Sequence, residues 1–163
     1  MTCHHLLTQP DPPVFAKARR LDPNKLETAK KEFKSMEKAG IIRKSTSPWS
    51  SPLHMVKKEE GLWRPWLSSS QQPYCSRKIR YPLPNIANFS AWVSGSKVFS
   101  KLDLQKGYYQ FPMAPDDIKK TAIITPFEMF EFLQLPFGLK NAGQTFHWLM
   151  EVCLTVLCMW MIS

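Results

Sequence analysis

Residues 99–104, Phe99-Ser100-Lys101-Leu102-Asp103-Leu104, form the most informative stretch of this chain. Apolar and polar residues alternate from Lys97 to Leu104, which predicts a strand that ends at Asp103. A carboxylate at a strand end is held rigidly, and the following turn, Gly107-Tyr108-Tyr109, leaves room for a substrate. An aspartate at a strand end is more often a simple turn cap, so the rest of the chain must distinguish the two roles.

A helix is predicted well before this stretch. Asp22 followed by Pro23 is a typical helix start, because aspartate suits the N-cap and proline suits the first turn. Apolar residues then recur on one helical face, and Gly40 is suited to end the helix. The residues of that face are Leu26, Ala29, Phe33 and Met36.

The remaining pattern mixes short strands with helices. Leu53 to Val56 is expected to be a strand, and Thr121–Thr125 with Met129–Leu133 should form a hairpin. Because no βαβ repeat is visible, the pattern predicts an α+β fold. Two more helical segments are expected, one from Tyr81 to about Val93 and one from about Asn141 that buries Phe146, Leu149, Met150, Cys153 and Leu157.

Composition favours a folded, intracellular protein with a polyanionic partner. The 163 residues are 44% hydrophobic and carry a net charge of +9, which favours nucleic acid but also fits an ordinary basic protein. The four cysteines lack the paired spacing of zinc sites, which suits a reducing compartment. The apolar run from Leu149 to Ser163 is shorter than the ~20 residues of a membrane span, so no membrane attachment is expected.

Five spaced motifs give the chain its resemblance to a known family. Together they closely resemble the reverse transcriptase of gypsy-type LTR retrotransposon Pol polyproteins, from about Pro13 to Val152. The resemblance implies the fingers and partial palm of a right-hand polymerase that copies an RNA or DNA template-primer with dNTPs. The motifs are Ser47-Pro48-Trp49-Ser50-Ser51-Pro52, Trp63-Arg64-Pro65, Tyr81-Pro82-Leu83-Pro84, Phe99-Ser100-Lys101-Leu102-Asp103-Leu104 and Leu135-Pro136-Phe137-Gly138-Leu139-Lys140-Asn141-Ala142.

The resemblance also implies roles for Asp103 and for Tyr108 in the turn that follows it. Asp103 matches the first metal-binding aspartate of the family, which would be catalytic and hold Mg²⁺ or Mn²⁺ near the triphosphate. Tyr108 matches the aromatic residue that lies under the sugar and rejects a ribose 2′-hydroxyl. The alternative role for Tyr108 is core packing.

Five other positions match nucleotide-binding residues of the family. Lys58 and Arg64 match fingers residues that grip the triphosphate, where a forked guanidinium suits phosphate oxygens. Phe137, Gly138 and Lys140 match the segment that packs against nucleotide and template. The alternatives are core packing for Phe137 and a solvated charge for Lys58.

The same resemblance divides the chain into segments. Residues 1–21 are an irregular extension, and residues 22–96 are the fingers-like segment, interrupted by an aberrant loop at 66–80. Residues 97–157 are a partial palm, and residues 158–163 are an aberrant C-terminus. The oligomeric state is left open.

A missing motif predicts that this polypeptide is inactive. The family needs Asp103 plus an adjacent aspartate pair in a Tyr-x-Asp-Asp hairpin, and the sequence contains no such motif. Asp116 and Asp117 are poor substitutes, and one carboxylate cannot hold two divalent ions against their mutual repulsion. The alternatives are a basic nucleic-acid-binding module without catalysis and a translated remnant without function.

Reading-frame shifts account for both aberrant segments. Met159, Trp160 and Met161 require the codons ATG TGG ATG, and with their neighbours the frame two nucleotides later reads Tyr or His, then Val-Asp-Asp. Family codons for Tyr-Arg-Arg-Leu-Asn-Asn, read one nucleotide early, give the residues found at 67–72. We therefore hypothesise a frameshifted element copy or a mispredicted gene model, which transcript sequencing would test.

One smaller departure lies in the hairpin turn. Glu128 occupies a position where relatives usually carry glycine. If that position required a positive φ, the glutamate would add strain of about 1 kcal/mol.

Overall fold

The computed structural model describes residues 3–6, 12–57, 63–66, 94–95, 97, 104–139, 141–148 and 150–151, and at 64 and 66 it describes the backbone alone. The helix expected at 81–93 lies outside these residues. So does the strand expected at 97–104, apart from its two ends. Within the described residues, no helix is both long enough and apolar enough to cross a membrane.

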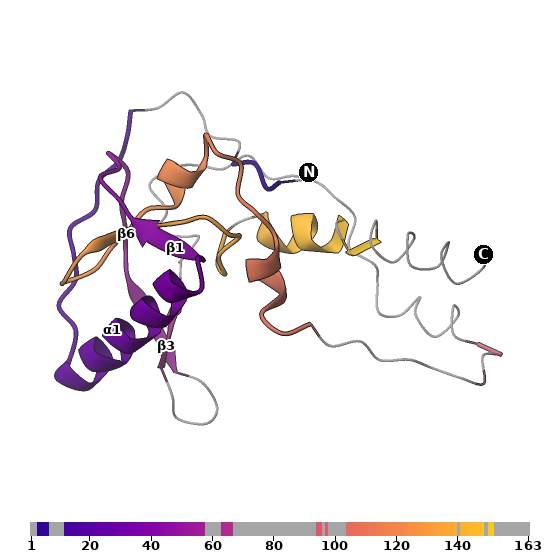
Figure 1. Cartoon of the computed structure of the whole chain (residues 1–163), viewed down its shortest axis with the longest axis horizontal. Helices are drawn as coiled ribbons and strands as arrows, with labels where there is room; N and C mark the ends of the chain where they lie inside the picture. Colours follow the sequence, from indigo (N-terminus) through magenta and orange to yellow (C-terminus); the bar gives the residue numbers. More distant parts are fainter. Residues whose placement is uncertain are drawn as a thin grey trace.

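The first predicted helix is confirmed as α1 (Pro23–Lys38), shown in indigo in Figure 1. Asp22 has the extended backbone of an N-cap residue, and its carboxylate contacts Lys25 at 3.0 Å. Ala29, Phe33 and Met36 are buried, as their helical spacing predicts. Gly40 has a φ of 68°, the left-handed conformation that glycine adopts at low cost after a helix.

Four short strands form a mixed sheet in the order β1-β6-β5-β2. β1 (Ile42–Lys44) and β5 (Ile123–Ile124) both pair antiparallel with β6 (Met129–Phe132), while β2 (Ser51–Pro52) pairs parallel with β5. The predicted hairpin is thus present as β5 and β6. Thr121, expected in its first arm, belongs instead to the short 3-10 helix η3 (Ile118–Thr121).

A separate two-stranded sheet consists of β3 (His54–Lys57) and β4 (Trp63–Trp66), which pair antiparallel. β3 confirms the strand expected near Leu53–Val56, shifted by one residue. The loop predicted at 66–80 is corrected at its first residue, because Trp66 pairs with His54 across the strands. The cross-strand pairing, and not the local composition, sets this boundary.

The hydrophobic core brings residues of α1 together with residues of β1, β5 and β6; α1 and β1 are labelled in Figure 1. Phe33 of α1 is 1% exposed, and its ring lies 5.0 Å from that of Phe130 and 5.9 Å from that of Phe127. An aromatic group from the helix and two from the hairpin therefore join the first third of the chain to the last.

The N-terminal residues form part of this folded body, although they lack regular structure. His4 pairs with Met113 through a parallel β-bridge, and the side chain of Leu6 is 3% exposed. The backbone N–H of Leu6 donates to the carboxylate of Asp117 at 2.9 Å. We call residues 3–6 the N-terminal strap.

Glu128 does not cause the strain considered above. Among the described residues other than glycine, only Lys106 has a positive φ. The hydroxyl of Thr125 accepts the backbone N–H of Glu128 at 2.9 Å and closes the turn without a glycine. The Glu128 carboxylate accepts a hydrogen bond from Lys44 across the sheet. This hydrogen bond to Glu128 also raises the pKa of the exposed Lys44 ammonium group.

Candidate functional site

The turn after the central stretch is the short 3-10 helix η2 (Gly107–Gln110), preceded by Lys106 in the left-handed conformation. Glycine at position 107 suits close packing, because a Cβ atom there would lie 3.0 Å from Cε2 of Phe146, a tight contact. The last described helix, residues 142–148, starts close to its predicted position at Asn141 and carries Phe146. The glycine therefore lets η2 approach this helix closely.

Five half-buried rings gather around η2. The ring of Tyr108 stacks on Phe146 with centroids 4.8 Å apart and lies 4.7 Å from the ring of Phe137. Tyr109 meets Phe137 edge-on at 5.4 Å, and Phe111 meets Phe146 edge-on at 5.5 Å. Such offset and edge contacts add about 0.5–1.5 kcal/mol per pair beyond burial. We call Tyr108, Tyr109, Phe111, Phe137 and Phe146 the aromatic cluster.

The segment that carries Phe137 is anchored on both sides. The N–H of Leu135 donates to the carbonyl of Phe111 at 2.8 Å, and the Leu135 side chain is fully buried. Gly138 has a φ of 94°, a conformation that other residues rarely adopt. The anchor at Leu135 and the turn at Gly138 hold the ring of Phe137 against Tyr108.

The N-terminal strap contacts the helix that carries Phe146 of the aromatic cluster. Nδ1 of His4 lies 2.8 Å from the hydroxyl of Thr145, next to Phe146 in the same helix. His4 is 1% exposed, and Nε2 of its ring has no hydrogen-bond partner in the described structure. Burial lowers the pKa of His4 to about 4, with a smaller opposing effect from Asp117. The ring is therefore neutral at physiological pH.

Asp117 has a structural role in the same region. Its buried carboxylate accepts hydrogen bonds from the N–H of Leu6 and, at 2.5 Å, from the ammonium group of Lys120. His5 lies 3.6 Å from the same carboxylate. The described residues contain no group of three or more His, Cys, Asp or Glu side chains that could hold a metal ion. The carboxylate of Asp117 thus anchors the strap and pairs with Lys120.

A comparison with protein-family models shows to which family the chain belongs. Residues 55–158 match the family model described as reverse transcriptase (RNA-dependent DNA polymerase). The chain belongs to the reverse transcriptase family. The match includes η2, the aromatic cluster and the segment around Phe137.

Relatives of this reverse transcriptase segment are polyproteins of transposons. It is 34% identical over 145 residues to the retrovirus-related Pol polyprotein from transposon opus of Drosophila melanogaster, covering 86% of this chain and 14% of the relative. The corresponding polyprotein from transposon gypsy of the same species is 33% identical, with 83% and 14% covered. Transposon Tf2-3 polyprotein of Schizosaccharomyces pombe is 31% identical, with 82% and 10% covered. The chain therefore spans about one seventh or less of these relatives.

Solved structures share the fold. The foamy viral protease-reverse transcriptase in complex with an RNA/DNA hybrid matches 90% of this chain and 20% of its own, with a TM-score of 0.73 and 19% identity. The same kind of protein in complex with double-stranded DNA gives a TM-score of 0.72 at 20% identity, covering 90% of this chain and 26% of that one. The reverse transcriptase segment thus has the α+β fold of polymerase fingers and palm.

The fold brings three of the predicted site residues together. Tyr108, Phe137 and Gly138 meet in the aromatic cluster and the turn beside it. The backbone of Arg64 lies in β4, paired with Val56, and its side chain lies outside the description. Asp103, Lys58 and Lys140 lie outside the described residues of this reverse transcriptase segment.

Sequence reasoning did not assign the supporting residues of this site. Tyr109 and Phe111 lie next to Tyr108 in the sequence. Their ring partners, Phe137 and Phe146, come from later segments. The contact between His4 and Thr145 joins residues 141 positions apart in the chain. Local patterns carry no signal for such a pairing, although a histidine in an otherwise uncharged apolar stretch is a weak hint.

Proposed function

We propose that this chain forms the nucleotide-binding part of a reverse transcriptase, which adds dNTPs to a primer on an RNA or DNA template. The aromatic cluster is the observation that carries the proposal, because it assembles Tyr108 and Phe137 from distant segments into one half-buried surface. A partly exposed aromatic surface suits a sugar or a base, which presents apolar faces.

The roles of individual residues follow the family resemblance. Tyr108 would lie under the sugar and select deoxyribose, while Phe137 and Gly138 would shape the nucleotide side of the pocket. The half-buried position of Tyr108 supports this role, since its ring packs on two neighbours and keeps part of its surface open. Lys58 and Arg64 would grip the triphosphate oxygens, and Lys140 would lie with Phe137 and Gly138 in the segment that packs against nucleotide and template.

Asp103 is the proposed metal ligand and the proposed catalytic residue. Asp117 does not fit that role, since Lys120 and the N–H of Leu6 already occupy its carboxylate. Asp103 precedes Leu104, which leads directly into η2, so the chain order is compatible with a metal next to the aromatic cluster. When bound, Mg²⁺ or Mn²⁺ would supply positive charge to the reacting phosphate.

The proposed segments are a fingers-like part at 22–96 and a partial palm at 97–157. Contacts of Leu6 and His4 with residues of the second part support counting the strap with the palm. A template-primer duplex is the proposed partner, supported by the net charge of +9 and by the nucleic acids named for the foamy viral structures. An intracellular site of action follows from that partner.

Equilibrium binding of an RNA/DNA hybrid to the full chain tests the proposal. Fluorescence anisotropy should detect binding at low salt, and the logarithm of affinity should fall linearly with the logarithm of salt concentration. Tyr108→Ala should weaken binding several-fold, whereas Tyr108→Phe, which keeps the ring, should bind like the parent chain. Absence of hybrid binding by a folded chain would contradict the proposal.

Primer extension separates binding of the hybrid from catalysis. The 163 residues contain no Tyr-x-Asp-Asp sequence, so we expect the polypeptide to bind a hybrid without extending its primer. Templated incorporation with Mg²⁺ or Mn²⁺ would overturn the expected inactivity and leave the binding proposal in place.

A further inference from the structure

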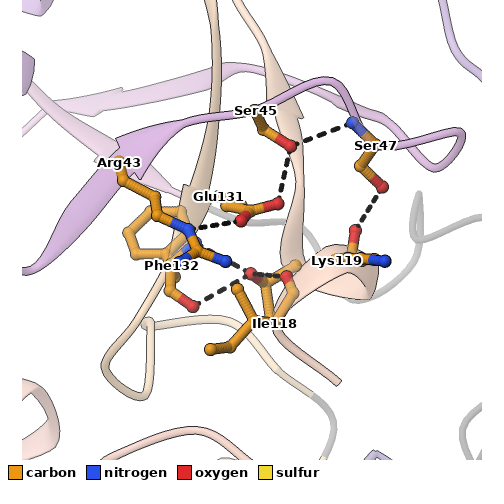
Figure 2. Close-up of polar contacts among 8 residues, drawn as sticks. Arg43, Ser45, Ser47, Ile118, Lys119, Glu131 and Phe132 are labelled. Atoms are coloured by element: carbon orange, nitrogen blue, oxygen red, sulfur yellow. Dashed lines mark hydrogen bonds and ion pairs between the residues drawn. The ribbon is translucent and has the colours of Figure 1, made fainter. Parts of the chain in front are cut away.

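A polar pocket lies on the four-stranded sheet and shares no residue with the aromatic cluster. It has a volume of about 340 Å³ and opens between the connection from β1 to β2 and the helix η3. Figure 2 shows several of its residues, with Glu131 of β6 at the centre of their hydrogen bonds. The lining residues are Arg43, Lys44, Ser45, Thr46, Ser47, Pro48, Lys119 and Glu131.

Three of these residues can still donate hydrogen bonds to a ligand. Arg43 uses Nε to donate to Glu131 at 2.6 Å, which leaves its two terminal nitrogens for another acceptor on a side chain that is 56% exposed. Lys119 is exposed, and no ion pair of its ammonium group occurs in the described part of the chain. Thr46 is exposed beside them and adds a hydroxyl group.

The acidic groups of the pocket are already neutralised. Glu131 receives Arg43 on one carboxylate oxygen and the hydroxyl of Ser45 on the other, at 2.6 Å each. Lys44 of the lining pairs with Glu128, which is not itself a lining residue. Because both carboxylates are matched by a cation, Lys119 leaves the pocket with an uncompensated positive charge.

The wall of the pocket is held in place before any ligand arrives. The hydroxyl of Ser47 donates to the backbone carbonyl of Lys119 at 2.7 Å, which fastens the loop to η3. The N–H of Ser47 donates in turn to the hydroxyl of Ser45 at 3.0 Å. Because the backbone that carries Thr46 and Lys119 is held in place, less entropy is lost on binding than from a free loop.

From this arrangement we propose that the pocket between the β1–β2 connection and η3 binds a phosphate group. A guanidinium with free terminal nitrogens, an ammonium group and a hydroxyl together match the oxygens of a tetrahedral phosphate. The phosphate can come from the backbone of a nucleic-acid strand or from free inorganic phosphate, and the pocket chemistry is the same for both. The nucleic-acid source rests on the proposed function, whereas the pocket itself does not.

NMR titration of the full, isotope-labelled chain tests the proposal with two probes, inorganic phosphate and a short single-stranded oligonucleotide. The backbone amides of Thr46, Ser47 and Lys119 should shift with at least one of them. Lys119→Gln should weaken that binding about fivefold, the upper range expected for one solvent-exposed charged contact. The matched control is Lys34→Gln, which removes an equal charge from the exposed face of α1 and should leave the shifts of these amides unchanged.

The outcomes separate the source of the phosphate from the existence of the site. Shifts with the oligonucleotide support a strand-binding site, and shifts with inorganic phosphate alone support a free-phosphate site. If neither probe moves these amides, or if Lys119→Gln and Lys34→Gln behave alike, the proposal is overturned. Failure of hybrid binding together with intact phosphate binding would contradict the proposed function and leave the pocket standing.

Discussion

Glu131 carries a buried negative charge in the middle of a β-strand, a position that costs free energy unless every oxygen is paired. Its two carboxylate oxygens meet that condition with Arg43 and Ser45 (Figure 2). Arg43 of β1 and the adjacent Ser45 therefore balance the charge of Glu131 in β6. β1 also supplies backbone hydrogen bonds to β6.

Glu131→Gln is expected to destabilise the chain. The substitution keeps the shape but removes the charge, so Arg43 loses its ionic partner and an amide group faces the Ser45 hydroxyl. The expected loss is about 1–3 kcal/mol in the free energy of unfolding, measured by urea denaturation. Lys44→Gln is the matched control, because its pair with Glu128 is solvent-exposed and should change the midpoint little. Equal effects of both substitutions would contradict the importance of burial.

His4 should make stability depend on pH. Burial lowers its pKa from 6.5 to about 4, so the unfolded chain binds a proton between these values and the folded chain does not. The stability linked to His4 is therefore complete above about pH 6.5 and is lost as the pH falls toward 4. The linked loss is roughly 3 kcal/mol at most.

Urea midpoints at neutral and mildly acidic pH check this expectation. His4→Gln should flatten the difference between the two midpoints, whereas Lys34→Gln changes an exposed residue of α1 and should retain it. A His4→Gln variant with the parent pH dependence would assign that dependence to other groups.

At the scale of elements, α1 should depend mainly on one side chain. Phe33→Ala leaves a cavity against Phe127 and Phe130 and should cost about 3–5 kcal/mol. The neighbouring Lys34→Ala should change stability by less than about 0.5 kcal/mol, because Lys34 is exposed. Circular dichroism during urea unfolding measures both. Similar losses for the two variants would mean that α1 packs less tightly than its buried face indicates.

The sequence predicted those elements whose cause is local. α1 follows from the spacing of Ala29, Phe33 and Met36, and its end follows from Gly40, all within one segment. β4 extends to Trp66 because β3 pairs with it, and a serine-rich neighbourhood hides that pairing from local reasoning. Elements that need a distant partner were therefore placed least well.

The candidate site divides along the same line. Tyr108, Phe137 and Gly138 were predicted from motifs, and the structure brings Tyr108 into contact with Phe137, while their nucleotide-binding roles stay a prediction. Phe146 was assigned only to a buried helix face, since its stacking on Tyr108 depends on the close approach at Gly107. Motifs identify the residues of such a site, while packing between segments supplies its geometry.

For the molecule as a whole, the two ends of the described chain support each other. The strap at 3–6 lies against residues 112–117 and reaches Thr145, in the helix that carries Phe146 of the aromatic cluster; Figure 1 shows the N-terminal segment in dark blue. Contacts over such long sequence separations are costly to form during folding and depend on each other once formed. The strap is accordingly part of the packing around residues 112–117 and Thr145, although its sequence predicts only an irregular extension.

Deletion of residues 1–6 should therefore reduce stability and loosen the aromatic cluster. The deletion exposes apolar surface covered by Leu6, removes the N–H bonded to buried Asp117 and frees Thr145 from His4. A loss of about 3 kcal/mol or more in the free energy of unfolding is expected, with a weaker near-ultraviolet circular dichroism signal from the Tyr108 environment. Phe15→Ser is the control, since that side chain is 56% exposed in the same irregular stretch and should leave both signals unchanged. Parent-like stability after the deletion would show that residues 112–117 and the last helix hold their positions without the strap.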